Sequence, residues 1–222
     1  MNKQKLNQIL KFVFSSFIWL GVAIFLLDII TKWCAQNLII EGQPVVLIPG
    51  FFKLALSHNE GAAWSLGDSG SVGMRILWIS VSVILSAALI FYYVKQYKKM
   101  TTWYRVALML MISGAVGNMI DRMFYWDAIV GFNGVIDWIS FTFGTYNFPS
   151  FNIADSSLVV GVIIILVLII IELIQDSIKK GKEGGYKLPP KEYEKQQELK
   201  KQQEQQKALD ESKKENNEEV HN

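Results

Sequence analysis

Apolar residues in this chain gather into four long blocks rather than into the short alternating runs of a soluble core. The blocks cover residues 12–30, 76–94, 103–120 and 153–174. Each approaches the roughly 20 residues that a helix needs to cross about 30 Å of hydrocarbon. The pattern therefore predicts a membrane α-helical protein with four transmembrane helices.

Lysine and arginine are distributed unevenly among the loops that join these blocks. Cytoplasmic loops of membrane proteins carry an excess of both residues. Here they cluster before the first block, between the second and third, and after the fourth, at Lys3, Lys5, Lys11, Lys95, Lys98, Lys99, Arg105, Lys179, Lys180 and Lys182. We therefore expect both termini in the cytoplasm and the polar motifs of the other two loops on the extracytoplasmic face.

The loop between the first two blocks is too long for a simple turn. Residues 44–48 and 51–56 favour β-strands and are separated by Pro49-Gly50, so they predict a small antiparallel sheet at the membrane surface. Asn59, Gly61 and Trp64 follow, in a segment that can also be read as an ordinary turn with an aromatic anchor. The later loop, residues 123–150, is rich in aromatic residues and is expected to lie on the membrane.

The chain is expected to divide into a membrane domain, residues 1–178, and a charged tail, residues 179–222. The tail is rich in Lys, Glu and Gln and has almost nothing apolar to bury, which is typical of disordered segments. Glu-to-Lys spacings between residues 192 and 214 suit a solvated helix. We expect a disordered segment or a frayed cytoplasmic helix, and a partner-binding coiled coil is the alternative.

Cysteine and histidine, which carry much enzyme chemistry, are scarce. Cys34 is the single cysteine, which excludes a disulfide within the chain and a cysteine-rich metal site. The two histidines are His58 and His221, and they do not form a His-Glu-x-x-His sequence. A zinc peptidase is therefore excluded, and we expect neither a metal nor an organic cofactor.

Two aspartates near the outer ends of the expected spans lie where a bilayer disfavours charge. Asp137 stands among apolar neighbours in the sequence GVIDW, and Asp155 opens the last span in the sequence FNIAD. Two close carboxyls that share one proton provide a base and an acid, which is how aspartic proteases activate water. The pair predicts acid–base chemistry at the outer face.

Further polar residues lie near the same ends of the spans. Asp28 and Lys32 are four residues apart on one helical face, a spacing that suits a supporting ion pair. Asn118 and Arg122 share a helix face, while Asp121 points elsewhere and suits an interhelix salt bridge. Ionisable groups within a membrane are costly, so they are candidates for function by default.

Two other classes of function compete with a peptidase. A proton-coupled transporter predicts carboxyls near the midplane and a larger, internally repeated set of spans. Here the carboxyls lie at helix ends, four spans are expected, and no repeat is visible. A non-enzymatic scaffold would explain the tail but leaves Asp137, Asp155, Asn118 and Asn152 without a reason. The peptidase is favoured.

Five short motifs occur in a fixed order along the chain. They are D-x-x-T-K from Asp28, N-x-G-A-A from Asn59, G-N-x-x-D-R from Gly117, G-x-x-D from Gly134 and F-N-x-A-D from Phe151. With these motifs the chain resembles the lipoprotein signal peptidases, the bacterial signal peptidases II, over nearly all of residues 10–178. It departs from the family pattern in a longer stretch around residues 124–133.

The resemblance implies a fold and an activity. The fold would be four transmembrane helices with a small extracytoplasmic β-cradle and a mobile flap, in the bacterial cytoplasmic (inner) membrane. The activity would be that of an aspartic endopeptidase that cleaves diacylglyceryl-modified prolipoproteins just before the lipid-modified cysteine, with its active site on the extracytoplasmic side.

The resemblance also implies roles for individual residues and for partners. Asp137 and Asp155 align with the catalytic pair. The positions that align with the substrate site are Asn59, Gly61, Asn118, Arg122 and Asn152, and those assigned to structural support are Asp28, Lys32 and Asp121. Expected partners are prolipoprotein substrates, membrane lipid and cyclic peptide inhibitors of the globomycin type, without nucleic acid, and the expected state is a monomer.

Overall fold

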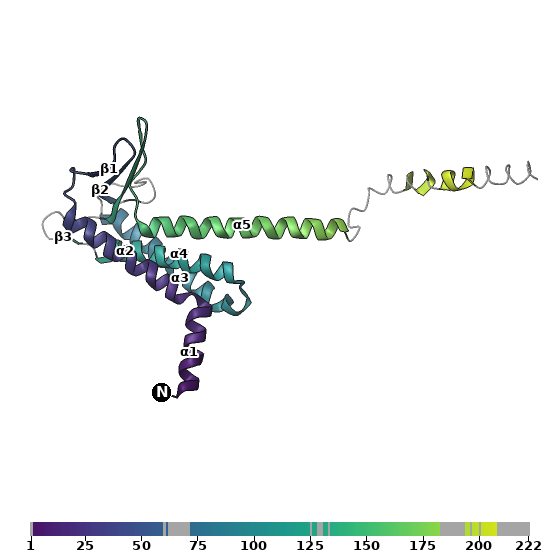
Figure 1. Ribbon diagram of the computed structural model, residues 1–222, viewed down its shortest axis with the longest axis horizontal. Helices are drawn as coiled ribbons and strands as arrows, with labels where there is room; N and C mark the ends of the chain where they lie inside the picture. The colour runs from purple at the N-terminus through teal and green to yellow at the C-terminus, as the bar shows by residue number, and fades with distance from the viewer. Residues whose placement is uncertain are drawn as a thin grey trace, which may run out of the picture. The chain divides into compact units, whose positions relative to one another are not determined.

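A computed structural model describes most of the chain, namely residues 2–59, 61, 72–124, 126–127, 131–132, 134–182, 194–195, 197–199 and 201–207. The chain divides into two compact units, Met1–Ile169 and Ile170–Asn222. The first unit contains the sheet, most of the helices and the beginning of the last long helix (Figure 1). Everything that positions the candidate site belongs to this unit.

Four helices within the described residues are long and apolar enough to cross a membrane, which confirms the expected fold class. They are α2 (Ile18–Leu38), α3 (Val72–Gln96), α4 (Thr102–Phe124) and α5 (Ile153–Lys182). A short 3₁₀ helix, η2 (Tyr97–Lys99), joins α3 to α4. The cytoplasmic location of the termini stays a prediction.

The first span differs from the expected block at residues 12–30. The chain forms a separate helix, α1 (Lys3–Ser16), and α2 begins after Phe17, whose φ of 58° is left-handed. This conformation is uncommon without glycine and interrupts the helix. At the other end α2 runs on to Leu38, because Asp28 and Lys32 pair with each other inside the protein instead of ending the span.

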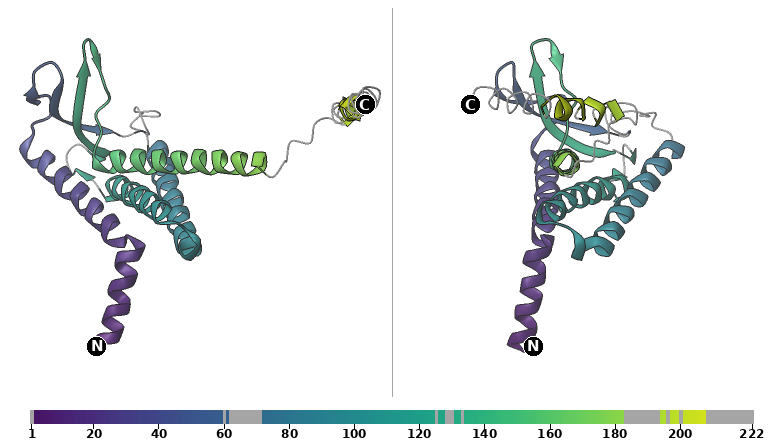
Figure 2. Two further views of the ribbon diagram at one scale, coloured as in Figure 1. Left: turned by 45° about the vertical axis from the view of Figure 1, so that its right-hand side comes forward. Right: turned by 90° about the vertical axis from the view of Figure 1, so that its right-hand side faces the viewer.

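The sheet combines the loop between α2 and α3 with the loop between α4 and α5. Its strands are β1 (Val45–Ile48), β2 (Phe52–Asn59), β5 (Val135–Phe143) and β6 (Tyr146–Asn147), antiparallel and in that spatial order. The pairing of β1 with β2 was expected from the sequence, with Gly50 at a φ of 71° in the turn between them. The sequence did not predict β5, which occupies a central position in the sheet although its residues were expected to belong to an aromatic loop. Figures 1 and 2 show the sheet at one end of α2 and α1 at the other.

The stretch before β5, which is expected to be longer than in the family, is described only in part. Within it, β3 (Trp126–Asp127) pairs with β4 (Gly131–Phe132) as a short hairpin. The flap that the resemblance implies was expected around residues 61–63, and of these only Gly61 is among the described residues; Trp64 also lies outside them.

Glycines let the spans of the first unit approach closely. A Cβ added to Gly117 of α4 would lie 2.7 Å from Asp28 Oδ2 and 3.3 Å from the Ala154 Cβ. A Cβ on Gly161 of α5 would lie 2.7 Å from the Ala107 carbonyl oxygen of α4. Small residues serve this purpose in many membrane helix interfaces. Gly117 therefore lets α4 approach α2 and the start of α5 closely, and Gly161 lets α5 approach α4.

The second unit, Ile170–Asn222, contains the end of α5 and helical residues at 194–195, 197–199 and 201–207. These described tail residues are exposed. The rest of the tail lies outside the described residues, so its disorder, its cytoplasmic location and the domain boundary at residue 178 stay predictions.

Candidate active site

A buried lysine lies at the base of the site. The Lys32 side chain is 2 % exposed, and its Nζ lies 2.7 Å from Asp28 Oδ2 and 2.7 Å from Asp121 Oδ2. The pair with Asp28 is the one that the spacing of four residues predicts, and the pair with Asp121 joins α2 to α4. The other oxygen of Asp28 accepts a hydrogen bond from the Ala154 N–H at 2.9 Å, which ties in the start of α5.

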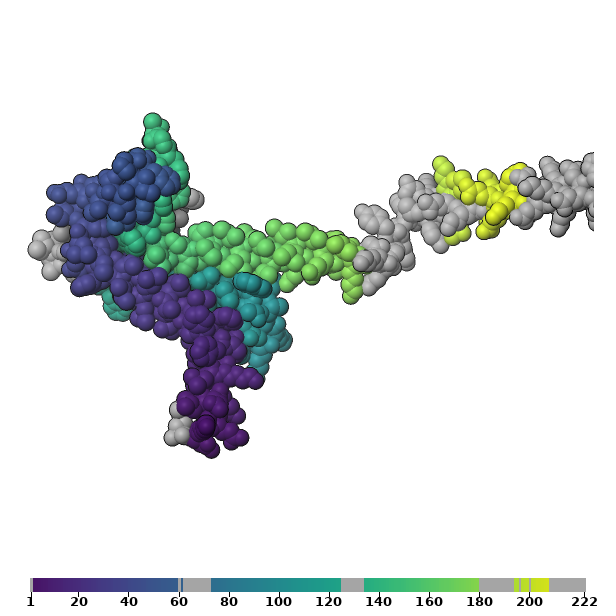
Figure 3. Space-filling view, viewed as in Figure 1, coloured from purple at the N-terminus to yellow at the C-terminus, as the bar shows by residue number. Residues whose placement is uncertain are grey.

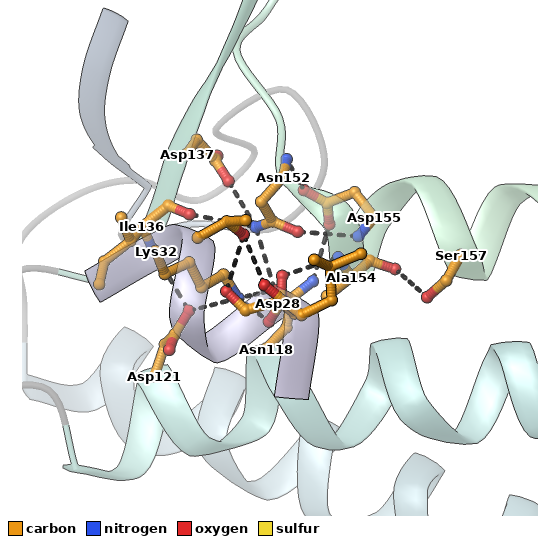
Figure 4. A network of polar contacts seen from close by, with 12 residues as sticks. Asp28, Lys32, Asn118, Asp121, Ile136, Asp137, Asn152, Ala154, Asp155 and Ser157 are labelled. Carbon is orange, nitrogen blue, oxygen red and sulfur yellow. Dashed lines mark hydrogen bonds and ion pairs between the residues drawn. The ribbon is translucent and has the colours of Figure 1, made fainter. Parts of the chain in front are cut away.

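Lys32 also fixes the orientation of the Asn118 amide. Its Nζ donates to Asn118 Oδ1 at 3.0 Å. Since an ammonium group can only donate, the amide oxygen must face Lys32, and the amide nitrogen must point away. That nitrogen donates to Asp155 Oδ1 at 2.7 Å. The Asn118 amide therefore connects Lys32 to Asp155, and Lys32 determines that the amide nitrogen faces the Asp155 carboxyl (Figure 4).

Asp155 is held by the first turn of α5. Asn152 precedes this helix, and its Oδ1 accepts from the Asp155 N–H at 2.8 Å, while Asp155 Oδ2 accepts from the Asn152 N–H at 3.1 Å. The two residues form a reciprocal capping box, in which side chains satisfy backbone donors at a helix start. A carboxylate is favoured there because the helix N-terminus carries partial positive charge.

Asn152 is also the link between the two aspartates. Its side chain is fully buried, and its Nδ2 donates to Asp137 Oδ1 at 2.7 Å and to Asn118 Oδ1 at 3.2 Å. One residue therefore contacts both carboxyls, Asp155 through its backbone and Asp137 through its amide. Figure 4 shows Asn152 lying between Asp137 and Asp155.

Asp137 enters the site from the sheet. Gly134, at a φ of 72°, leads into β5, and β5 pairs with β2 so that Asp137 lies opposite Ser57. Its Oδ2 accepts from Asn59 Nδ2, a longer contact of 3.4 Å. Burial, and then the nearby Asp155 carboxylate, raise the pKa of Asp137 from its ordinary value to about 8.

Arg122 connects the site to the segment after β2. It donates to the Gly61 carbonyl oxygen at 3.0 Å and to Ser82 Oγ of α3 at 3.4 Å. Gly61 in turn donates its N–H to Asn59 Oδ1 at 3.1 Å. Arg122 also lies near enough to the aspartates to interact electrostatically with Asp155, Asp121 and Asp137.

The structure brings every candidate residue from the sequence into one connected cluster of polar contacts. Sequence reasoning missed Ser82 and the backbone groups of Ile136 and Ala154 that complete it, because main-chain partners leave no signal in residue type. It also missed the capping box, although N-x-x-D before an apolar run is a recognisable signal for one. Among the described residues, no group of His, Cys, Asp and Glu side chains is arranged to hold a metal ion.

The arrangement suits acid–base chemistry on a neutral substrate. Two carboxyls lie together with neutral amides as their main hydrogen-bond partners, and the cation Lys32 is engaged by Asp28 and Asp121 instead. A pair of this kind can hold one proton, with one carboxyl ionised and the other neutral.

Comparison with known proteins shows what this chain is similar to. The family model described as signal peptidase (SPase) II matches residues 20–171. A lipoprotein signal peptidase of Enterococcus faecalis is 39% identical over 158 residues, covering 71% of this chain and 88% of the relative. One from Pseudomonas aeruginosa is 35% identical over 147 residues, covering 66% and 82%. A solved bacterial membrane enzyme has a TM-score of 0.59 and 31% identity, with 71% of this chain and 94% of that one covered.

Proposed function

The chain belongs to the signal peptidase II family, a family of membrane peptidases, and from that premise we propose that it uses Asp137 and Asp155 as an aspartic dyad. Membership supports the removal of signal peptides from prolipoproteins. The observation that carries the proposed dyad is the position of Asn152, which is hydrogen-bonded to both carboxyls at once. Such a bridge fixes the spacing of two groups that must act on the same water molecule.

The two aspartates have different environments, which suggests different roles. Asp155 accepts from Asn118 Nδ2 and from a backbone N–H at the start of α5, and both favour the ionised form. Asp137 is 2 % exposed and lies on a strand, without the partial positive charge of a helix N-terminus, which favours its neutral form. In the proposed resting state Asp155 is the base and Asp137 is the acid, with its proton on Oδ2, where the contact with Asn59 is long.

Hydrolysis then balances with one water molecule. Asp155 takes a proton from the water while the water oxygen attacks the scissile carbonyl carbon. At the same time Asp137 gives its proton to the carbonyl oxygen. In the second step the proton on Asp155 passes to the leaving nitrogen, the C–N bond breaks, and the proton of the diol returns to Asp137. The amides of Asn118 and Asn152 hold the carboxyls throughout without adding charge.

The proposed substrate is a diacylglyceryl-modified prolipoprotein, cut just before the lipid-modified cysteine. Asn59, Gly61, Asn118, Arg122 and Asn152 would line its site. Arg122 would hold the backbone after β2 in place through the Gly61 carbonyl. The enzyme would act as a monomer in the bacterial cytoplasmic (inner) membrane, with the dyad on the extracytoplasmic side, surrounding lipid as its medium, and cyclic peptides such as globomycin as inhibitors.

A gel-shift assay with a diacylglyceryl prolipoprotein tests the dyad. The variants are Asp137→Asn and Asp155→Asn, which keep side-chain size and remove the carboxyl. Asp176→Asn, an exposed change of the same kind in α5, is the matched control. Loss of cleavage in both site variants, with normal thermal unfolding and with cleavage retained by the control, is the expected result. Full cleavage by either site variant refutes the dyad.

The same assay tests whether the dyad needs the proton that is assigned to Asp137. If Asp137 is the acid, the wild-type rate falls as pH rises through about 8, because the acid loses its proton. A rate that stays constant through this range contradicts the assignment of Asp137 while leaving the dyad intact.

A further inference from the structure

Helix α1 is set apart from the membrane span that follows it. Phe17 stands between them in the left-handed conformation, its N–H bonded to the Phe14 carbonyl at 3.4 Å, and its own carbonyl accepts from Leu20 and Gly21 in α2. Figures 1 and 2 show the chain changing direction at this point, so that α1 runs across the direction of α4. With 14 residues, α1 is about 21 Å long, too short to cross a bilayer.

The sequence of α1 has two distinct faces. At 100° per residue, Leu6, Ile9, Leu10 and Val13 lie on one face, and Gln4, Asn7, Gln8 and Lys11 on the other. The apolar face is not buried by the rest of the protein, since Leu6, Ile9 and Leu10 are 40 to 47% exposed. In Figure 3, the side of α1 that faces the viewer is uncovered. This face needs a partner that the described chain does not supply.

The charge of this region is entirely positive. Lys3, Lys5 and Lys11 lie in α1, and no acidic residue precedes Asp28. The C-terminal end of α1 is fixed beside η2, which carries Lys98 and Lys99, because Ser15 Oγ lies 3.0 Å from the Tyr97 hydroxyl. Two further contacts hold the same end, the Phe12 ring on Tyr97 and the Arg105 guanidinium on the Ser15 carbonyl.

We propose that α1 lies in the plane of the membrane surface, with its apolar face among the acyl chains and its lysines against anionic lipid headgroups. Amphipathic helices with basic polar faces bind membranes in this way. The partner is identified by continuity, since α2 enters the membrane directly after Phe17, and by charge, since anionic leaflets attract basic segments next to a span. The surface is the one reached by the α3–α4 connection, opposite the aspartates. The inference is independent of the proposed function.

Spin labels on the full-length protein test this placement. In a Cys34→Ser background, single changes such as Ile9→Cys, Leu10→Cys and Val13→Cys label the apolar face, and Asn7→Cys, Gln8→Cys and Lys11→Cys label the polar face. After reconstitution into vesicles of equal parts phosphatidylcholine and phosphatidylglycerol, accessibility to oxygen and to a nickel chelate reports depth. We expect oxygen access to peak on the apolar face, with the period of about 3.6 residues of an α-helix.

Two results overturn the placement. Nickel access at every position would mean that α1 lies in water, and oxygen access at every position would mean that it continues the span. Either result leaves the cleavage assay and the proposed function untouched, so the two can fail separately.

The role of the headgroups has its own test. Lys3→Gln, Lys5→Gln and Lys11→Gln are combined, and the control combines Lys195→Gln, Lys201→Gln and Lys207→Gln in the exposed tail. Three lysines near an anionic surface strengthen binding by roughly a hundredfold. The label at position 10 should therefore become shallower in the α1 variant and not in the control. If the label at position 10 lies at the same depth in vesicles with and without phosphatidylglycerol, α1 does not recognise anionic headgroups.

Discussion

Replacing Lys32 with methionine should destabilise the protein strongly, because the buried ammonium group is the shared counter-ion of two carboxylates. Its Nζ lies 2.7 Å from both Asp28 Oδ2 and Asp121 Oδ2, and its side chain is 2 % exposed. Methionine keeps the length of the side chain but leaves two buried carboxylates without a counter-ion. Breaking a buried ion pair in this way costs about 3–5 kcal/mol.

The destabilisation can also be calculated from the cost of protonating the carboxyls. In Lys32→Met, each carboxyl that has lost its counter-ion can become neutral by binding a proton. An aspartate has an ordinary pKa of about 3.9, so protonation at pH 7 costs about 4 kcal/mol, at 1.36 kcal/mol per unit. At pH 5 the same protonation costs only about 1.5 kcal/mol per carboxyl. The destabilisation of Lys32→Met relative to wild type should therefore shrink on acidification, by on the order of 3 kcal/mol for each carboxyl that binds a proton.

The free energy of unfolding can be measured by SDS titration in mixed micelles, followed by tryptophan fluorescence at pH 5 and pH 7. Lys98→Met, an exposed lysine in η2, is the matched control. A loss of less than about 1 kcal/mol at pH 7 relative to this control would refute the reasoning, because buried unpaired charges cost more than that. A loss that is equal at both pH values would show that the carboxyls are not its cause.

Four further predictions test other parts of the site. First, the folded chain holds a proton on Asp137 that the unfolded chain releases, so stability should fall as pH rises from about 4 to about 8, and Asp137→Asn should flatten this dependence in the same titration. Second, Gly117→Ala should lower stability and cleavage, because its Cβ would lie 2.7 Å from Asp28 Oδ2, whereas Gly73→Ala, with open space around it, should change neither. Third, Asn152→Ala should lower the cleavage rate roughly 10²–10³-fold, with exposed Asn37→Ala as control in the same gel-shift assay. Fourth, EDTA should leave cleavage unchanged, and inhibition that added zinc reverses would contradict the dyad mechanism.

The sequence was most informative where the physical cause is local. Apolar blocks set the four spans, and Pro49-Gly50 marked the turn between β1 and β2. The spacing of Asp28 and Lys32 predicted their ion pair, because residues four apart on a helix face each other.

Structural features that depend on residues far apart in the sequence could not be predicted from local patterns. The interruption at Phe17 has no glycine or proline to signal it, and it depends on contacts with Tyr97 and Arg105 far along the chain. The strand β5 looked like an aromatic loop because its partner, β2, lies about 80 residues away. The orientation of the Asn118 amide follows from Lys32, which is on another helix.

The pairing of β2 with β5 determines where this protein tolerates changes in length. Side chains alternate between the two faces of a strand, so a slip of β5 by one residue along β2 would turn Asp137 to the opposite face. The loop before β5 is under no such restriction, since β2 sets the register of β5 from the other side. The stretch that is expected to be longer than in the family contains β3 and β4 and lies in this loop. A change of length there is therefore expected to leave Asp137 on the same face of the sheet.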